Sequence, residues 1–106
     1  MWVMEAYVDT ARAARYVEQL SKHFAHQPGG MRLLEDEPGE LLIDLGNVAW
    51  RIRAEPDRLV LRLEAEDAAR LDEASGHVAE RIEQLGRRDG LRVNWQPTAE
   101  VSKDRR

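Results

Sequence analysis

The sequence predicts an α+β domain, a two-layer sandwich in which two helices pack on one face of a mainly antiparallel sheet. Two segments repeat apolar residues every three or four positions, as amphipathic helices do. The remaining segments repeat apolar residues every second position, as half-buried strands do. The resulting order is strand, helix, four-strand meander, helix, strand. Since each element carries one apolar face, two layers are enough to bury all of these faces.

The first predicted strand covers residues 2–8, in which apolar and polar side chains alternate. Asp9 or Thr10 can cap the helix that follows, because both side chains accept hydrogen bonds from amides of a first helical turn. Pro28-Gly29-Gly30 ends this helix. Its apolar stripe consists of Ala13, Tyr16, Val17, Leu20 and Phe24.

Residues 31–64 are predicted to form four short antiparallel strands. Pro38-Gly39, Gly46-Asn47 and Pro56-Asp57 supply the turns between them. The inward-facing apolar rows are Leu41, Ile43 and Leu45, then Val48, Trp50, Ile52 and Ala54, then Leu59, Leu61 and Leu63. The opposite positions are mostly charged, so the second face of the sheet is expected to be open to solvent.

The second helix is predicted over residues 67–85, with Asp67 as its cap and Gly76 as a weak point in its interior. Its apolar stripe consists of Leu71, Ser75, Val78, Ile82 and Leu85. A last strand is expected at residues 91–95, where Leu91, Val93 and Trp95 alternate with polar residues.

The composition fits a single small domain and narrows the class of partner. A chain of 106 residues with 42% hydrophobic content can form one modest core, predicted over residues 1–97, with 98–106 as a disordered polar tail. The net charge of -4 disfavours nucleic acid as a partner. The lack of cysteine fits a reducing cytoplasm, and no apolar run reaches the length of a membrane span. We therefore expect a cytosolic protein without a membrane partner.

Short segments spread over residues 6–95 carry a family resemblance. They are Ala6-Tyr7-Val8-Asp9-Thr10, Ala14-Arg15-Tyr16, Lys22-His23-Phe24-Ala25-His26, Leu59-Val60-Leu61 with Ala65, and Ile82-Glu83 with Gly86 and Trp95. This pattern resembles the small bacterial family catalogued as domain of unknown function 2218. The resemblance implies a small bacterial α+β domain and carries over neither an activity nor catalytic residues. At the position of the family's histidine near the end of the second helix, this chain has Arg81, which weakens a shared metal site.

His23 and His26 place two of the three histidines at the end of the first helix. Their spacing puts both rings on one helix face, and neutral imidazole binds zinc, copper, nickel and iron. A third ligand would have to come from elsewhere, such as His77, Glu73 or Glu80 on the second helix, a dimer mate or a bound chelate. His77 lies about 120° from the centre of its own apolar stripe, which turns it away from the first helix. A structural role is therefore favoured: His23 at the edge of the core, His26 in solvent, and both complementing the helix dipole.

The outward face of the sheet supplies a second candidate site. Four arginines alternate there with inward apolar residues, so their guanidinium groups are expected to share one surface. They are Arg51, Arg53, Arg62 and Arg92. Such a surface would bind a small anionic ligand, with His23 as a further candidate contact. The alternatives are cross-strand pairing with Glu40, Asp44 and Glu64, and self-association favoured by Leu42 and Val60.

The sequence contains no phosphate-cradling glycine loop, nucleophile elbow or zinc-protease helix motif. The expected function is therefore non-enzymatic: a ligand-binding or accessory protein whose partner is a small anionic molecule or another protein. This expected function needs no cofactor. One alternative is a metal-linked protein that binds a divalent metal through His23 and His26. A further alternative is a dimerisation module that acts through the open sheet face.

Overall fold

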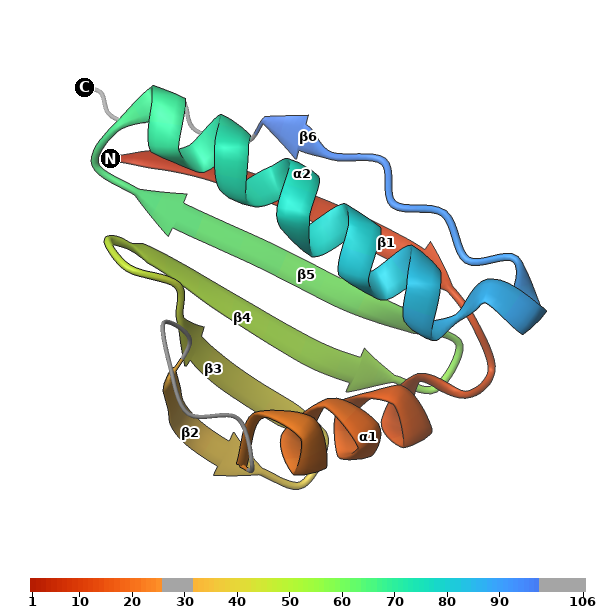
Figure 1. The fold of residues 1–106 in the computed structure, drawn as a ribbon. Coiled ribbons are helices and arrows are strands. Elements are labelled where there is room, and N and C mark those ends of the chain that lie inside the picture. The colour runs from red at the N-terminus through yellow and green to blue at the C-terminus, as the bar shows by residue number, and fades with distance from the viewer. Residues whose placement is uncertain (26–31, 98–106) are drawn as a thin grey trace.

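The computed structural model describes residues 1–25 and 32–97, and it places two helices on one face of a six-stranded sheet (Figure 1). The strands lie in the order β2-β3-β4-β5-β1-β6, and all neighbours are antiparallel. They are β1 (Trp2–Asp9), β2 (Arg32–Glu37), β3 (Glu40–Asp44), β4 (Val48–Glu55), β5 (Arg58–Ala65) and β6 (Gln96–Pro97). The helices are α1 (Ala13–Ala25), α2 (Ala68–Leu85) and the short 3-10 helix η1 (Arg87–Asp89). The predicted α+β sandwich is confirmed.

Local chemistry explains where the elements begin and turn. Gly46 and Asn47 both have positive φ, 85° and 66°, which is the geometry that a two-residue hairpin between β3 and β4 requires. The Leu45 amide donates to the Val48 carbonyl at 2.9 Å and closes that turn. The Asp67 carboxylate accepts from the Ala69 amide at 2.8 Å and caps α2, as the sequence predicts.

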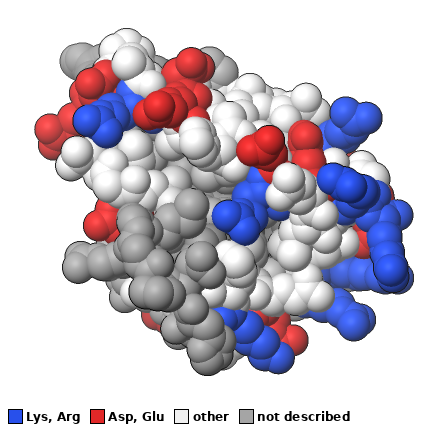
Figure 2. All heavy atoms as spheres, in the orientation of Figure 1, with Lys and Arg blue, Asp and Glu red and all other residues white. Residues whose placement is uncertain are grey.

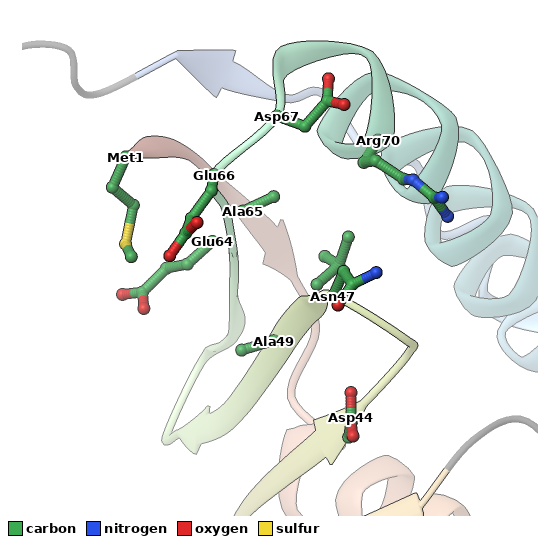
Figure 3. Close-up of a pocket in the computed structure, with 10 residues that line it drawn as sticks. Met1, Asp44, Asn47, Ala49, Glu64, Ala65, Glu66, Asp67 and Arg70 are labelled. Carbon is green, nitrogen blue, oxygen red and sulfur yellow. The ribbon is translucent and has the colours of Figure 1, made fainter.

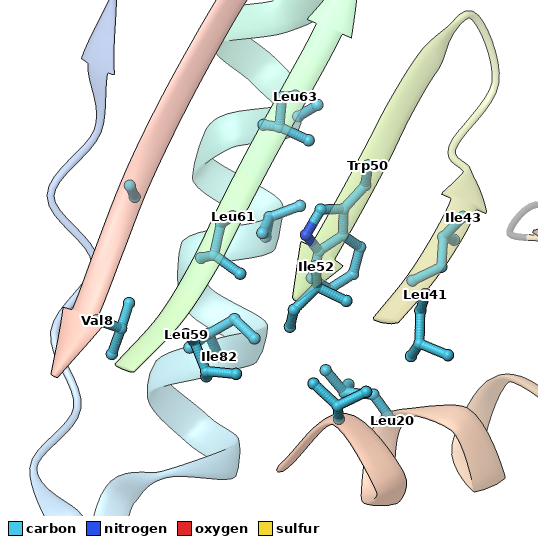
Figure 4. Packing of buried hydrophobic residues seen from close by; sticks show 14 of the residues in the cluster. Val8, Leu20, Leu41, Ile43, Trp50, Ile52, Leu59, Leu61, Leu63 and Ile82 are labelled. Atoms are coloured by element: carbon cyan, nitrogen blue, oxygen red, sulfur yellow. The ribbon is translucent and has the colours of Figure 1, made fainter. Parts of the chain in front are cut away.

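The core lies between the helices and the sheet. The opposed residues Ile52 and Leu61 on β4 and β5 are fully buried, and they face Leu20 of α1 and Ile82 of α2 across the layer (Figure 4). Helix α1 covers β2, β3 and β4, whereas α2 covers β5 and β1 and touches β4. Both helices therefore leave the other face of the sheet uncovered.

The predicted last strand is wrong over residues 91–95, which belong to no strand; only Gln96–Pro97 pair with β1. The segment runs along α2 instead (Figure 1). The Val93 amide donates to Glu83 Oε2 at 3.0 Å, and Trp95 Nε1 donates to the Ser75 carbonyl at 2.9 Å. These bonds to the helix hold the chain away from the edge of β1, and an extended segment packed on a helix shows the same alternation as a strand.

Three expectations of the sequence fall outside the described residues. They are the position of His26, the helix stop at residues 28–30 and the disordered tail at 98–106. None of the described helices is long and apolar enough to cross a membrane.

Candidate anion-binding site

Carboxylates pair with the arginines of β4 and β5 on the open sheet face. Arg51 Nη1 lies 3.1 Å from Glu40 Oε2 on the neighbouring strand. Arg62 contacts two carboxylates at 2.7 Å, Glu5 of β1 and Glu64 of its own strand. The hydrogen bond to Glu64, and then that to Glu5, raise the pKa of Arg62. The cross-strand pairing that we weighed against ligand binding is therefore present for these arginines.

A second network closes the same face at the turn between β4 and β5. Glu55 accepts from Arg53 at 3.0 Å and from Arg58 at 2.7 Å, and the bond from Arg58 chiefly lowers the pKa of Glu55. The Arg58 guanidinium also lies 4.5 Å from the ring centre of Tyr7. Val60, between these groups in the sheet, retains only 9% exposure. Self-association through this face stays a prediction.

Arg92 does not belong to this surface, contrary to the sequence prediction. It lies in the extended segment beside α2, because residues 91–95 leave the sheet edge. The open face thus brings together Arg51, Arg53 and Arg62, and adds Arg58, which the sequence analysis did not select.

A different set of arginines meets where α1 begins and α2 ends. We call this place the helix-end hollow; its volume is about 440 Å³. Its lining residues are Arg12, Arg15, Tyr16 and Gln19 from α1 and the turn before it, and Gln84, Leu85, Arg87, Arg88 and Asp89 from α2 and η1. Figure 2 shows Lys and Arg side chains gathered at this end of the molecule. The sequence analysis missed the hollow because its two groups of arginines lie more than 70 positions apart.

One contact joins the two sides of the helix-end hollow. The Tyr16 hydroxyl donates a hydrogen bond to Asp89 Oδ2, and the Tyr16 ring is buried in the core. Burial chiefly raises the pKa of Tyr16 from its ordinary 10.0, and the bond to Asp89 raises it further, so this hydroxyl keeps its proton. Arg12 Nη1 lies 3.9 Å from Asp89 Oδ1.

The hollow carries excess positive charge. Within residues 1–25 and 32–97, no carboxylate forms an ion pair with Arg15, Arg87 or Arg88. The first turn of α1 contains no acidic residue that would offset the positive end of its dipole. Asp89 is the one carboxylate that lines the hollow in the described part of the chain.

The model of a family described as uncharacterized protein conserved in bacteria (DUF2218) matches residues 5–96. The chain belongs to the DUF2218 family. This confirms the resemblance found in the sequence, and the matched range includes every residue of the helix-end hollow. This DUF2218 chain is also similar to a structure described as the NMR structure of PA4090 from Pseudomonas aeruginosa, with 30% identity and a TM-score of 0.73. The similarity covers 92% of this chain and 97% of that one. No curated protein matches.

In this DUF2218 domain, His23 is half-buried and lies beside Arg81 of α2. Its Nε2 atom is 3.2 Å from Arg81 Nη1. Because a guanidinium can only donate, Nε2 is the acceptor in this contact. A fixed cation at Nε2 disfavours a metal ion at the same nitrogen. The described residues contain no group of three or more His, Cys, Asp or Glu that could hold a metal.

His77, which the helical wheel predicts to face away from the first helix, lies one turn before Arg81. It lines a hollow of about 150 Å³ together with Arg81 and Trp50. The two basic side chains therefore share one face of α2, and this is the face from which Arg81 reaches His23.

A larger hollow of about 600 Å³ lies at the opposite end of α2, between its start and the ends of β4 and β5. Four carboxylates and one arginine line it: Asp44, Glu64, Glu66, Asp67 and Arg70. Figure 3 shows Glu64 and Glu66 close to Met1 on one side and Arg70 on α2 on the other. Since its charge is predominantly negative, this hollow repels anions.

Proposed function

We propose that this DUF2218 domain is a non-enzymatic protein that binds a small anionic ligand in the helix-end hollow. One observation carries the proposal: Arg15, Arg87 and Arg88 line one hollow without a carboxylate partner in the described part of the chain. The sheet arginines, by contrast, already pair with carboxylates. Guanidinium groups bind carboxylates and phosphates through paired hydrogen bonds, so arginines that line one hollow without a carboxylate partner in the described part of the chain favour such a ligand.

The size and walls of the hollow support the same proposal. Its volume of about 440 Å³ is in the range of small-molecule sites. Gln19 on α1 and Gln84 on α2 add amide groups that can donate and accept on the two sides. The proposed site is therefore at the helix ends and differs from the sheet face that the sequence analysis predicts. The absence of cysteine supports a reducing compartment such as the cytosol.

Titration with inorganic phosphate and with succinate at low ionic strength, followed by NMR chemical shifts, tests this function. In Arg15→Gln/Arg88→Gln, binding should weaken by about tenfold or more, because each lost charge-assisted hydrogen bond contributes on the order of 1.5 kcal/mol or more. The matched control is Arg51→Gln/Arg53→Gln, which removes the same charge from the sheet face. This control should bind as the wild type does.

Two results would overturn the proposal. One is a wild-type protein that binds neither anion at millimolar concentration. The other is an equal loss of affinity in both double variants, which would indicate attraction to the overall charge instead of a site. Circular dichroism on each variant checks that the fold is retained.

A further inference from the structure

We infer that Asp89 makes the helix-end hollow selective for small zwitterions, with Arg15, Arg87 and Arg88 holding the anionic group and Asp89 holding an ammonium group. This inference rests on the proposed function and names the ligand class of the same site. It predicts amino carboxylates or amino phosphates as ligands, in preference to simple anions and to dianions.

The Asp89 carboxylate is held in place from two directions. Its Oδ2 accepts from the buried Tyr16 hydroxyl, and its backbone amide donates to the Gly86 carbonyl at 3.0 Å within the η1 turn. Gly90, with φ 69°, ends that turn directly after it. The carboxylate therefore stands in a fixed position among the arginines, and a ligand meets it without having to order it first.

The other carboxylate oxygen keeps capacity to accept. Asp89 Oδ1 lies 3.9 Å from Arg12 Nη1, which is beyond hydrogen-bond distance. The Arg12 side chain is 63% exposed, whereas that of Asp89 is 27% exposed, so solvent weakens this pair. An ammonium group can bind Oδ1 without displacing a formed hydrogen bond.

The charge pattern then discriminates among ligands. A monoanion gains only the guanidinium contacts. A dianion of the same length places its second charge near Asp89, and the repulsion from this carboxylate offsets part of the attraction by the arginines. A zwitterion makes favourable contacts with both kinds of charge. Its anionic group binds the arginines, and its ammonium group binds the Asp89 carboxylate, which would repel a second anionic group.

The test compares three probes with the same carbon chain, namely 4-aminobutyrate, butyrate and succinate, by NMR titration of the whole chain. The wild type should bind 4-aminobutyrate about tenfold more tightly than the other two, since one added charge-assisted hydrogen bond contributes on the order of 1.4 kcal/mol. Matched sets built on 3-aminopropanoate and 5-aminopentanoate cover shorter and longer separations of the two charges.

Asp89→Asn is the decisive variant, because the asparagine oxygen still accepts from Tyr16 while the negative charge is gone. The preference for the amino acid should disappear, and succinate should bind more tightly than to the wild type. Asp72→Asn, an exposed position on α2, makes the same change in net charge and should behave as the wild type.

The failures of the two proposals are distinguishable. The zwitterion inference is wrong, and anion binding stands, if the dianion of every set binds to the hollow as tightly as the amino acid of that set. The same conclusion follows if the preference for the amino acid persists in Asp89→Asn. If no probe of any set binds the wild type, the zwitterion inference is wrong, and anion binding is wrong as well when inorganic phosphate also fails to bind.

Discussion

The hydroxyl of Tyr16 donates to the carboxylate of Asp89, a residue 73 positions later, and thereby fixes the start of α1 against η1. Tyr16 presents its ring to the core and its hydroxyl to the helix-end hollow. One side chain therefore serves both the stability of the fold and the geometry of the proposed site.

Tyr16→Phe should lower the free energy of unfolding by about 1–2 kcal/mol, because the ring stays buried while the part-buried Asp89 loses its hydroxyl donor. Urea denaturation measures the change. The control is Tyr7→Phe, which removes an exposed hydroxyl bound to Glu5 at 3.1 Å and should change the value by about 0.5 kcal/mol or less. Equal losses in the two variants would show that the bond to Asp89 contributes no more than a surface contact.

The burial of Tyr16, together with its bond to Asp89, should make stability fall at alkaline pH. The pKa of Tyr16 is raised in the fold, first by burial and then by Asp89, so the unfolded hydroxyl ionises at a lower pH than the folded one. The stabilisation is complete below the ordinary value of 10.0 and is lost as pH rises toward the folded pKa. Between about pH 9 and about pH 11, the wild type should lose more stability than Tyr16→Phe. Parallel pH profiles would contradict this assignment.

Leu41 and Leu42 are neighbours on β3 that face opposite sides of the sheet. Leu41 is fully buried under the helices, whereas Leu42 is half-buried on the open face opposite Arg51. Leu41→Ala should cost about 2–5 kcal/mol and Leu42→Ala about 1 kcal/mol or less, as measured by chemical denaturation. A larger cost at Leu42 would mean that the open face is covered in solution.

Gly76→Ala should raise the free energy of unfolding by about 0.5–1 kcal/mol. The residue is exposed in the middle of α2, and a Cβ added there meets nothing within 4 Å, so only the entropy of the unfolded chain changes. Gly86→Ala is the contrasting variant, because its Cβ would overlap the side chain of Leu91. Thermal melts should move in opposite directions for the two, and a lower melting temperature for Gly76→Ala would contradict the first expectation.

Zinc, nickel and ferrous iron should not bind at micromolar concentration through His23, since its Nε2 already accepts from Arg81. Calorimetry on the wild type and on His23→Ala/His26→Ala measures this. Micromolar binding that disappears in the double variant would restore the metal-linked alternative.

Much of the fold follows from local patterns. The alternation in β3, β4 and β5, the turn at Gly46-Asn47 and the Asp67 cap were all readable, because each depends on residues close together in the chain. The ion pairs of Arg51 with Glu40 and of Arg62 with Glu64 were predicted as an alternative for the same reason, since alternate residues of a strand lie on one face.

The errors concern contacts between distant segments. Alternation at residues 91–95 was interpreted as a strand, but it marks an extended segment bound to α2 through Glu83 and Ser75. Arg92 was placed on the wrong surface as a result. The contact between His23 and Arg81 depended on how α1 and α2 lie on the sheet, whereas His77 lies beside Arg81 because the two residues are one turn apart on the same helix.

The sequence by itself determined the two long helices and the strands from β1 to β5 of this DUF2218 domain, together with their order, because periodicity and turn chemistry act over a few residues. The tertiary structure decided which charges meet. It paired the arginines of the open sheet face with carboxylates. It also placed Arg12, Arg15, Arg87 and Arg88 in one hollow with Asp89. Such a site arises only when the start of α1 and the η1 turn after α2 come together, and no spacing along the chain specifies that contact.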